Sequence, residues 1–336
     1  QQGIVINTGR KQLGLRMTLD QKAFNDKLDI QYNILNSQTI HDNVDANIFY
    51  WSYNILPVTP EIVDGKDNPI YNYNYLNPVW MQNNEYKKST DNLNMQSIVV
   101  NYDLFKGIKI GAMGNISRMN TQYDYFLPTI PGTGTAINNN AFRYMSNTNS
   151  QKGDIHINYA GTFGKSNVTA TGVYEYNYYE DDNYSASGAG FLVDANQYNA
   201  LQSGITSLQT ISSYKEEYKL ISFLAKATYN YDNRYYLTAS IRRDGSSKFG
   251  SKYQNGYFPA VSAAWRISQE KFLRDVSWID ELKINLGYGI TGNSDAIGAY
   301  NTLLLLGGSV HTYDPTNPGN PGPVGYTPIQ NPNTDL

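Results

Sequence analysis

The residues able to hold a metal ion are few and scattered. The three histidines, His41, His156 and His311, lie far apart, and none is followed after two or four residues by another histidine or a cysteine. Zinc sites use such short spacings. The acidic runs at 64–68 and 180–182 offer carboxylate oxygens to calcium, but neither has the spacing of a calcium-binding loop. We therefore predict solvated loops at both runs, and neither a metal site nor a cofactor.

Motifs for phosphate binding and for hydrolysis are also missing from the sequence. The glycines at 132–134 and 298–308 are not followed by the lysine and serine or threonine of a phosphate-binding loop. No Gly-x-Ser-x-Gly sequence is present to carry a nucleophilic serine. We therefore expect a protein without enzymatic activity.

Aromatic side chains in the first long polar segment are the remaining candidates for ligand contact. Such rings stack on a sugar or pack against a peptide, and they also fold a loop on itself, so both interpretations stay open. The candidate substrate-binding residues are Trp51, Tyr53, Tyr71, Tyr73, Tyr75 and Trp80.

The elements that would position these residues are β-strands. Successive side chains of a strand point to opposite faces, so alternation of apolar and polar residues indicates a strand with two unlike faces. The alternation recurs in about ten segments, which predict strands of about 8–12 residues, the length that crosses a bilayer at a tilt. These segments are 13–19, 28–34, 98–104, 108–116, 155–163, 168–176, 221–231, 235–241, 257–267 and 282–290.

The connections between these segments alternate between short and long. We expect tight turns at 105–107, 164–167 and 232–234, long loops at 36–96, 118–153 and 178–218, and a further loop at 314–328. Outer-membrane barrels have short periplasmic turns and long extracellular loops. The sequence therefore predicts an all-β fold: a section of an antiparallel transmembrane β-barrel, with its apolar face toward lipid and its polar face toward the lumen.

Tyrosines at strand ends support the membrane interpretation. The chain has 30 tyrosines, and those at 174, 176, 229, 231 and 235 fit an aromatic girdle at the membrane interface. Packing in a soluble β-core is the competing explanation for them. The mean hydropathy of -0.51 and the short apolar runs predict no transmembrane helix.

Charge and cysteine content narrow the possible partners. The net charge of -3 leaves no basic block for a row of phosphates, so a nucleic-acid partner is not expected. The charged share of 16% is low against about 25% in soluble domains. The absence of cysteine excludes disulfides and thiolate metal sites.

From about Tyr218 onward the chain resembles the barrel of the SusC/RagA family of TonB-linked outer-membrane proteins. The segments that carry the resemblance are YYLTASIRRDGSSKFG (235–250), GYFPAVSAAWRI (256–267) and LKINLGYGITGN (282–293). The earlier residues resemble the family in the rhythm of strands and loops more than in wording. Glu270, Phe272, Leu273 and Trp278 continue the match between the last two segments.

The resemblance implies a barrel of about 22 strands, filled by an N-terminal plug, in the outer membrane of a Gram-negative bacterium. It implies TonB-dependent import of an oligosaccharide, or of a peptide, with a SusD-like surface lipoprotein as a lid. Membrane lipid and lipopolysaccharide would surround the barrel. Residues 1–336 are then expected to be part of one barrel domain, with the plug, the signal peptide and the final strands outside this chain.

Three alternatives remain open on the sequence. A passive or structural barrel, such as a porin, would show the same alternation without a plug. A secreted soluble glycan-binding β-protein would bury the apolar face as a core. An enzymatic barrel is the third alternative, and it lacks a candidate set of catalytic residues.

Overall fold

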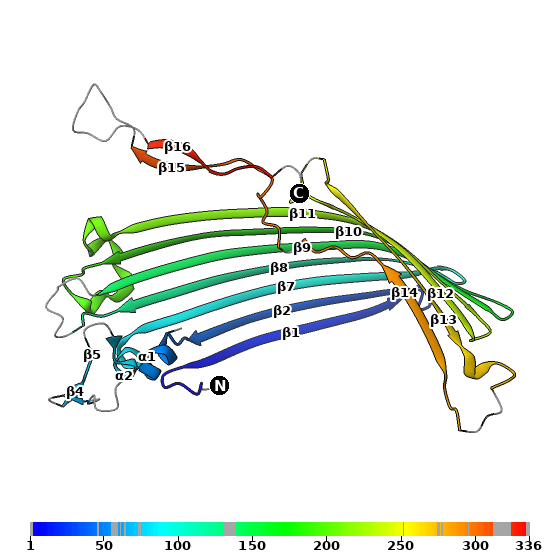
Figure 1. Cartoon of the computed structure of the whole chain (residues 1–336), viewed down its shortest axis with the longest axis horizontal. Coiled ribbons are helices and arrows are strands. Elements are labelled where there is room, and N and C mark those ends of the chain that lie inside the picture. The colour runs from blue at the N-terminus through cyan, green and yellow to red at the C-terminus, as the bar shows by residue number, and fades with distance from the viewer. Residues whose placement is uncertain are drawn as a thin grey trace.

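The computed structural model describes residues 3–45, 47–54, 60, 62–63, 65–72, 75–130, 139–250, 252–273, 276, 278–294, 296–311 and 324–333. Ten strands of this part of the chain form one antiparallel sheet, in the order in which they follow along the sequence (Figure 1). Among the described residues, no helix is both long and apolar enough to span a bilayer. The all-β prediction is therefore confirmed.

The sheet is a continuous meander of long strands. In Figure 1, β1, β2 and β7 to β11 run side by side, and β12 to β14 bend away at the end where the tight turns lie. The strands are β1 (Gly9–Ala23), β2 (Leu28–Asp42), β7 (Tyr86–Phe105), β8 (Ile108–Leu127), β9 (Asn140–Phe163), β10 (Ser166–Ala189), β11 (Thr210–Tyr231), β12 (Tyr235–Ser246), β13 (Asn255–Arg266) and β14 (Lys283–Gly289).

The tight turns follow from residues that tolerate a positive φ. Gly107 closes the β7–β8 turn at a φ of 81°, and Gly164 serves the β9–β10 turn at 60°. In the β11–β12 turn, Asp232 and Asn233 both have a φ of 54°, as the central residues of a type I′ hairpin require. The three predicted turns are confirmed at these positions.

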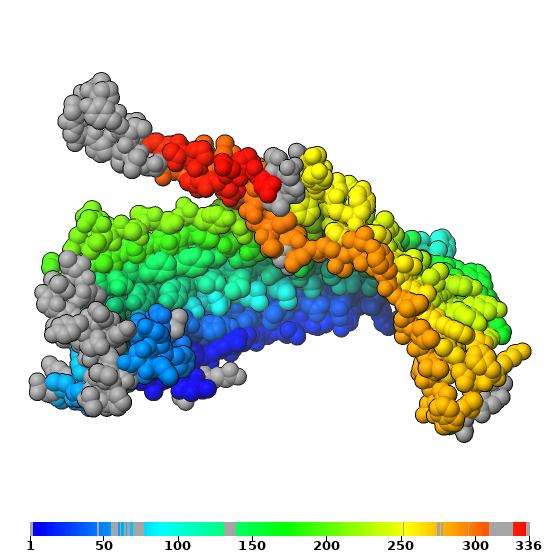
Figure 2. Space-filling view, viewed as in Figure 1, coloured from blue at the N-terminus to red at the C-terminus, as the bar shows by residue number. Residues whose placement is uncertain are grey.

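The sheet is bent, and its apolar face lies on the convex side. On β9, Ile155 and Ile157 are 64% and 50% exposed, whereas the neighbouring Asp154 and His156 on the other face are less exposed. Side chains splay apart on a convex face and crowd together on a concave one, so this difference identifies the two sides. Figure 2 shows the sheet as one curved wall, coloured in sequence order.

The convex apolar residues form rows across the strands, and we call this surface the apolar band. One row joins Ile110, Ile157, Gly172, Ala225 and Ile241 by direct register. The apolar side chains of these rows are not packed into a dry interior within the described structure, since the large ones are mostly exposed. The soluble β-protein with a buried core is thus not what the chain forms.

Tyrosines border the apolar band on both sides. Tyr229, Tyr231 and Tyr235 lie beside the β11–β12 turn, with Tyr231 stacked on Tyr235 at a centroid distance of 6.4 Å. Tyr174 and Tyr176 lie several residues further from the turns on β10, where the convex face changes to polar residues. This arrangement agrees with the predicted aromatic girdle.

The strands are longer than predicted, and the loops are correspondingly shorter. β9 and β10 each contain 24 residues, and β7 and β8 each contain 20. The loops expected at 36–96, 118–153 and 178–218 reduce to 43–85, 128–139 and 190–209. The prediction missed these extensions because polar residues occupy both strand faces there, which hides the alternation.

Short elements occupy the long-loop end of the sheet. They are α1 (Ile48–Asn54), α2 (Pro78–Asn84), the small sheets β3 (Ile62–Val63) with β4 (Lys66–Asp67) and β5 (Ile70–Asn72) with β6 (Tyr75–Leu76), and the 3-10 turns η1 (Asp194–Asn199), η2 (Leu201–Ser203) and η3 (Thr206–Leu208). Asn77 caps α2 by accepting a hydrogen bond from the Val79 amide at 2.9 Å.

The last part of the chain forms a separate hairpin. β15 (Leu305–His311) pairs with β16 (Val324–Gln330) and with no strand of the large sheet in the described structure (Figure 1). The loop predicted at 314–328 therefore contains the first residues of a strand, and its earlier residues lie outside the described part. The sequence did not indicate this strand, because Tyr326 and Ile329 are three residues apart and do not form an alternating pattern.

Candidate functional site

The concave wall of the sheet carries a polar network at the level of the apolar band. His156 of β9 contacts Asp154 through Nδ1 at 2.8 Å and the Asn101 Oδ1 of β7 through Nε2 at 3.2 Å. Gly111 of β8 faces this ring, and a Cβ at Gly111 would collide with both His156 and Asn101. The glycine thus leaves the space in which His156 lies across β8.

A second network continues along the same wall on β10 to β12. The Arg242 guanidinium donates to Asp244 at 2.7 Å and to the Ser222 hydroxyl at 2.9 Å, and it lies 3.6 Å from the Glu175 carboxylate. Ser222 is 1% exposed, so its contact with Arg242 is sheltered from solvent. The lower concave wall is therefore hydrophilic and charged.

Further toward the long-loop end, the concave wall centres on Asp181 of β10. Its carboxylate accepts hydrogen bonds from Ser146 at 2.6 Å, Thr148 at 3.0 Å and Asn183 at 2.9 Å. Burial opposes the ionisation of Asp181, but the three hydrogen bonds outweigh it and hold the pKa of the carboxyl below its ordinary value. Asp181 is therefore a fixed negative charge at neutral pH.

Tyrosines accompany Asp181 on this upper concave wall. Tyr179 and Tyr218 stack at a centroid distance of 5.1 Å, and the Lys248 ammonium lies 4.1 Å from the Tyr218 ring centre. Tyr123 and Phe142 lie on the same face, with ring centres 6.0 Å apart. Rings beside carboxylates and hydroxyls are a surface on which sugars or peptides can stack and hydrogen-bond.

A hollow of about 440 Å³ opens at the rim of this wall, lined by Tyr123, Tyr125, Phe142, Lys87 and Asp45 among others. The Lys87 ammonium forms ion pairs with Asp45 and, at 3.2 Å, with Glu85. Burial raises the pKa of Glu85 although Lys87 opposes the shift, and burial together with Glu85 raises the pKa of Tyr125. The rim thus combines aromatic rings with a largely compensated charge cluster.

The predicted substrate-contact residues are only partly brought together. Trp80 is 5% exposed and packs with Met81, Leu127 and Ile130, with Trp51 half-buried against them. Tyr53 is 91% exposed on the same short helix as Trp51. The three positions whose side chains are described thus divide between a small loop core, with Trp51 and Trp80, and one open ring, Tyr53.

Tyr71 belongs to β5 and Tyr75 to β6, and the side chains of both lie outside the described part of the chain. Tyr73 lies wholly outside the described residues. The acidic residues at 180–182, expected in a solvated loop, instead lie within β10. Because strand residues alternate, Asp181 points to the concave wall while Glu180 and Asp182 lie on the convex side.

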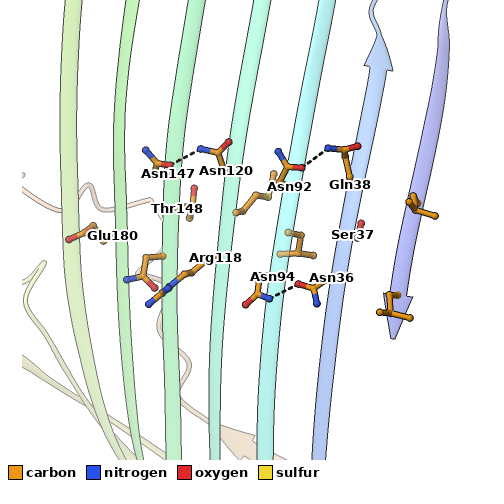
Figure 3. Close-up of a pocket in the computed structure, with 15 residues that line it drawn as sticks. Asn36, Ser37, Gln38, Asn92, Asn94, Arg118, Asn120, Asn147, Thr148 and Glu180 are labelled. Carbon is orange, nitrogen blue, oxygen red and sulfur yellow. Dashed lines mark hydrogen bonds between the residues drawn. The ribbon is translucent and has the colours of Figure 1, made fainter. Parts of the chain in front are cut away.

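A second hollow, of about 730 Å³, lies on the convex face above the apolar band. Figure 3 shows amide side chains from neighbouring strands facing one another there, with Gln38 bonded to Asn92 and Asn120 bonded to Asn147. Its surroundings are Leu13 and Leu15 on β1 and Glu180 on β10. This hollow faces away from the concave wall.

At the tight-turn end, Glu270 ties the long β13–β14 connection to the sheet. Its carboxylate accepts hydrogen bonds from Tyr235 at 2.6 Å and Trp265 at 3.2 Å, and from Arg234 at 3.1 Å. The Tyr235 hydroxyl bond is the main cause that lowers the pKa of Glu270. The connection, which begins with η4 (Ile267–Gln269), is thereby held against the neighbouring turn.

Sequence reasoning missed the upper concave wall as a candidate site. Asp181, Tyr179 and Tyr218 fell inside a segment expected to be loop, so no face could be assigned to them. The available signal was weak: alternating positions 177, 179, 181 and 183 read Asn, Tyr, Asp and Asn, which differ little from the positions between them.

Among known proteins, the chain is similar in sequence to TonB-dependent receptors. No family model matches the chain. TonB-dependent receptor P3 of Formosa agariphila is 32% identical over 203 residues, which are 60% of this chain and 20% of that receptor. TonB-dependent receptor SusC of Bacteroides thetaiotaomicron is 38% identical over 109 residues, which are 32% of this chain and 11% of SusC.

Among solved structures, one of the RagAB peptide transporter superposes with a TM-score of 0.83 at 23% identity. The superposition covers 98% of this chain and 37% of the compared chain. At that identity the likeness establishes the fold. The chain matches about a fifth of the length of the first curated relative.

The convex apolar band, the concave polar wall and the short turns opposite long loops define a wall section of an outer-membrane β-barrel. In sequence the chain is similar to TonB-dependent receptors, among them SusC of Bacteroides thetaiotaomicron. The curated relatives that it matches are receptors, not enzymes.

Proposed function

We propose that the protein of which these strands form the wall imports a nutrient across the outer membrane with energy supplied through TonB. The observation that carries the proposal is the division of the sheet into a convex apolar band and a concave polar wall. Proteins named TonB-dependent receptors match the chain in sequence. Import of this kind requires binding and movement, and no covalent chemistry.

The ten strands would form part of a larger closed barrel. In the described structure β1 and β14 each pair with a single strand, so each leaves one edge of backbone donors and acceptors open. Open edges are not tolerated in lipid, because water cannot satisfy them there. Further strands of the same protein, to a total of about 22, would close the barrel around a plug.

We propose an oligosaccharide as the cargo, with a peptide as the competing class. The upper concave wall supports this choice, since it places Tyr179, Tyr218 and Asp181 side by side. Rings that stack and a carboxylate that accepts hydrogen bonds suit sugar hydroxyls. A SusD-like lipoprotein would cover the extracellular mouth, and TonB would act through the plug.

Among the described side chains of the aromatic segment proposed for ligand contact, the open ring of Tyr53 is the accessible one. Trp51 and Trp80 would then support the loop, and Tyr71, Tyr73 and Tyr75 remain proposed contacts. A ligand held between this segment and the upper wall would lie at the long-loop end of the sheet, where the extracellular side is expected.

The experiment is uptake and binding by the full-length receptor, with and without its lipoprotein partner. Asp181→Asn should weaken binding of the imported oligosaccharide by about three- to tenfold, because a charged hydrogen-bond acceptor is replaced by a neutral one. Asp182→Asn is the matched control, because it changes the adjacent residue on the convex face. Tyr53→Ala should weaken binding without changing the amount of receptor in the membrane.

Three results would contradict the proposal. Uptake that persists without TonB would indicate a passive barrel such as a porin. Selective retention of peptides would move the cargo to the other class. Equal loss of binding in Asp181→Asn and Asp182→Asn would remove the concave wall from ligand contact.

A further inference from the structure

Two convex rows just above the apolar band consist almost wholly of amides. The row nearer the band joins Asn36, Asn94, Arg118 and Asn149 by direct register, and the next joins Gln38, Asn92, Asn120 and Asn147. These eight positions on β2, β7, β8 and β9 line the hollow of about 730 Å³ (Figure 3). We call the seven amides among them the amide patch.

The amide patch is only partly satisfied by its own hydrogen bonds. Asn36 pairs with Asn94, Gln38 with Asn92 at 2.9 Å, and Asn120 with Asn147 at 2.7 Å. Asn94 also accepts a hydrogen bond from Gln96 at 3.2 Å. Each amide has two N–H donors and a carbonyl with two lone pairs, so these bonds leave most of the capacity of the patch unused in the described structure. Asn149 Oδ1 is buried and makes no hydrogen bond in the described structure.

The amide patch continues the lipid-facing surface without a break. On β2 the convex residues run from Leu28 through Ile30, Tyr32 and Ile34 directly to Asn36 and Gln38. On β9 they run from Ile157 and Ile155 through Gly153 and Gln151 to Asn149 and Asn147. A surface in this position stands at the level of the lipid head groups, on the side of the long loops.

The chemistry of the patch distinguishes between kinds of head group. Neutral amides donate to and accept from hydroxyls, as saccharides require, whereas a phosphate is bound by clustered cations or backbone N–H groups. Arg118 is the sole cation among the residues that line the hollow in the described structure, and Glu180 at its border is negative. The patch therefore suits a sugar more than a bare phosphate.

We propose that the amide patch binds the saccharide head group of the outer-leaflet glycolipid, lipopolysaccharide, as a fixed boundary lipid. The acyl chains lie against the apolar band below, and sugar hydroxyls bond to the spare donors and acceptors of the amides. Arg118 contacts an acidic substituent of the same head group. This role is independent of the cargo, and it rests only on the position of the chain in the outer membrane.

The test uses the full-length receptor purified from outer membranes in mild detergent. The patch variant is Asn36→Ala, Asn94→Ala, Asn120→Ala and Asn147→Ala, one amide from each of the strands β2, β7, β8 and β9. The matched control removes one concave amide from each of the same strands: Asn33→Ala, Asn101→Ala, Asn115→Ala and Asn158→Ala. Bound lipids are quantified by mass spectrometry, before and after delipidation and titration with lipopolysaccharide.

We expect the patch variant to bind lipopolysaccharide at least about tenfold more weakly, since several hydrogen bonds are lost together. The concave control should bind as the parent does. A truncated glycolipid without its outer sugars, and phosphatidylglycerol, should bind the parent and the patch variant alike. Uptake, measured in the same cells, reports separately on the proposed import.

Four outcomes would overturn the inference. The first is equal retention of lipopolysaccharide by patch variant and parent. The second is equal loss in the patch variant and the concave control. The third is tight binding of phosphatidylglycerol that also depends on the patch. The fourth is a change in the oligomeric state of the patch variant with unchanged lipid binding, which would make the patch an interface between copies.

Discussion

An arginine scan along β9 tests the orientation of the sheet most directly. Ile157 lies midway between Phe163, beside the tight turn, and Gln151, where the convex face becomes polar. Six residues at about 3.3 Å each span about 20 Å along the strand, or about 15 Å of height at a tilt of about 40°. Since the apolar band of such barrels is about 25 Å tall, Ile157 lies near the bilayer midplane.

Ile157→Arg should therefore destabilise the folded receptor strongly, whereas Asn158→Arg, at the neighbouring position, should not. An arginine facing lipid at the midplane costs about 2–4 kcal/mol, whereas one near the interface costs about 0–1 kcal/mol. We expect the ratio of folded to unfolded receptor to fall about thirty- to nine-hundredfold for Ile157→Arg. Phe163→Arg should have a small effect, and Asn158→Arg, on the concave wall, should have little.

The assay is folding of the full-length receptor into lipid vesicles across a urea series, followed by gel migration with and without heating. The three arginine variants and the parent are compared at one lipid composition. Equal destabilisation by Ile157→Arg and Asn158→Arg would refute the assignment of faces. A larger effect at Asn158 than at Ile157 would show that the apolar face points inward.

Three further predictions concern separate parts of the chain. Trp80→Ala should destabilise the 43–85 segment by about 3–5 kcal/mol, seen as faster proteolysis there with unchanged barrel migration. The pKa of Glu270 is lowered from 4.5 in the folded state, so the stability that its carboxylate gives to the β13–β14 connection is fully present above pH 4.5. That stability is lost as the pH falls through the lower folded pKa. Proteolysis of the 267–282 connection should thus accelerate at acid pH in the parent and depend less on pH in Glu270→Gln. Gly111→Ala should cost about 1–3 kcal/mol by displacing His156, whereas Gly153→Ala, whose Cβ would meet its nearest atom at 3.6 Å, should be tolerated.

The membrane-spanning parts of the fold were predictable because lipid imposes a simple rule on them. Ile155 and Ile157 had to alternate with Asp154 and His156 once one face met lipid and the other met water. Turn positions were predictable as well, since Gly107 and the Asp232–Asn233 pair are residues that tolerate a positive φ.

Beyond the bilayer the same rule no longer applies, and prediction failed there for that reason. The successive residues Asn36 and Ser37 of β2 lie on opposite faces of the strand and both are polar, so this part of the strand resembles a loop in sequence. The convex amides and the concave Asp181 became distinguishable only when register placed them on opposite sides. The burial of Trp80 was likewise not readable, because it depends on Leu127 at the end of β8 and on Ile130 in the loop that follows.

The unbroken register between β2 and β7 has a consequence for how such a wall can change. Leu28 faces Tyr102 and Asp42 faces Lys88, with every pair between them in step, although the whole 43–85 segment intervenes in the chain. The pairing of β2 with β7 therefore does not depend on the sequence of that segment, provided that the two ends of the segment lie side by side. Loops of different length or origin could be exchanged at Asp42 and Tyr86 while the scaffold keeps its shape, which makes this junction a natural point for grafting a new recognition segment.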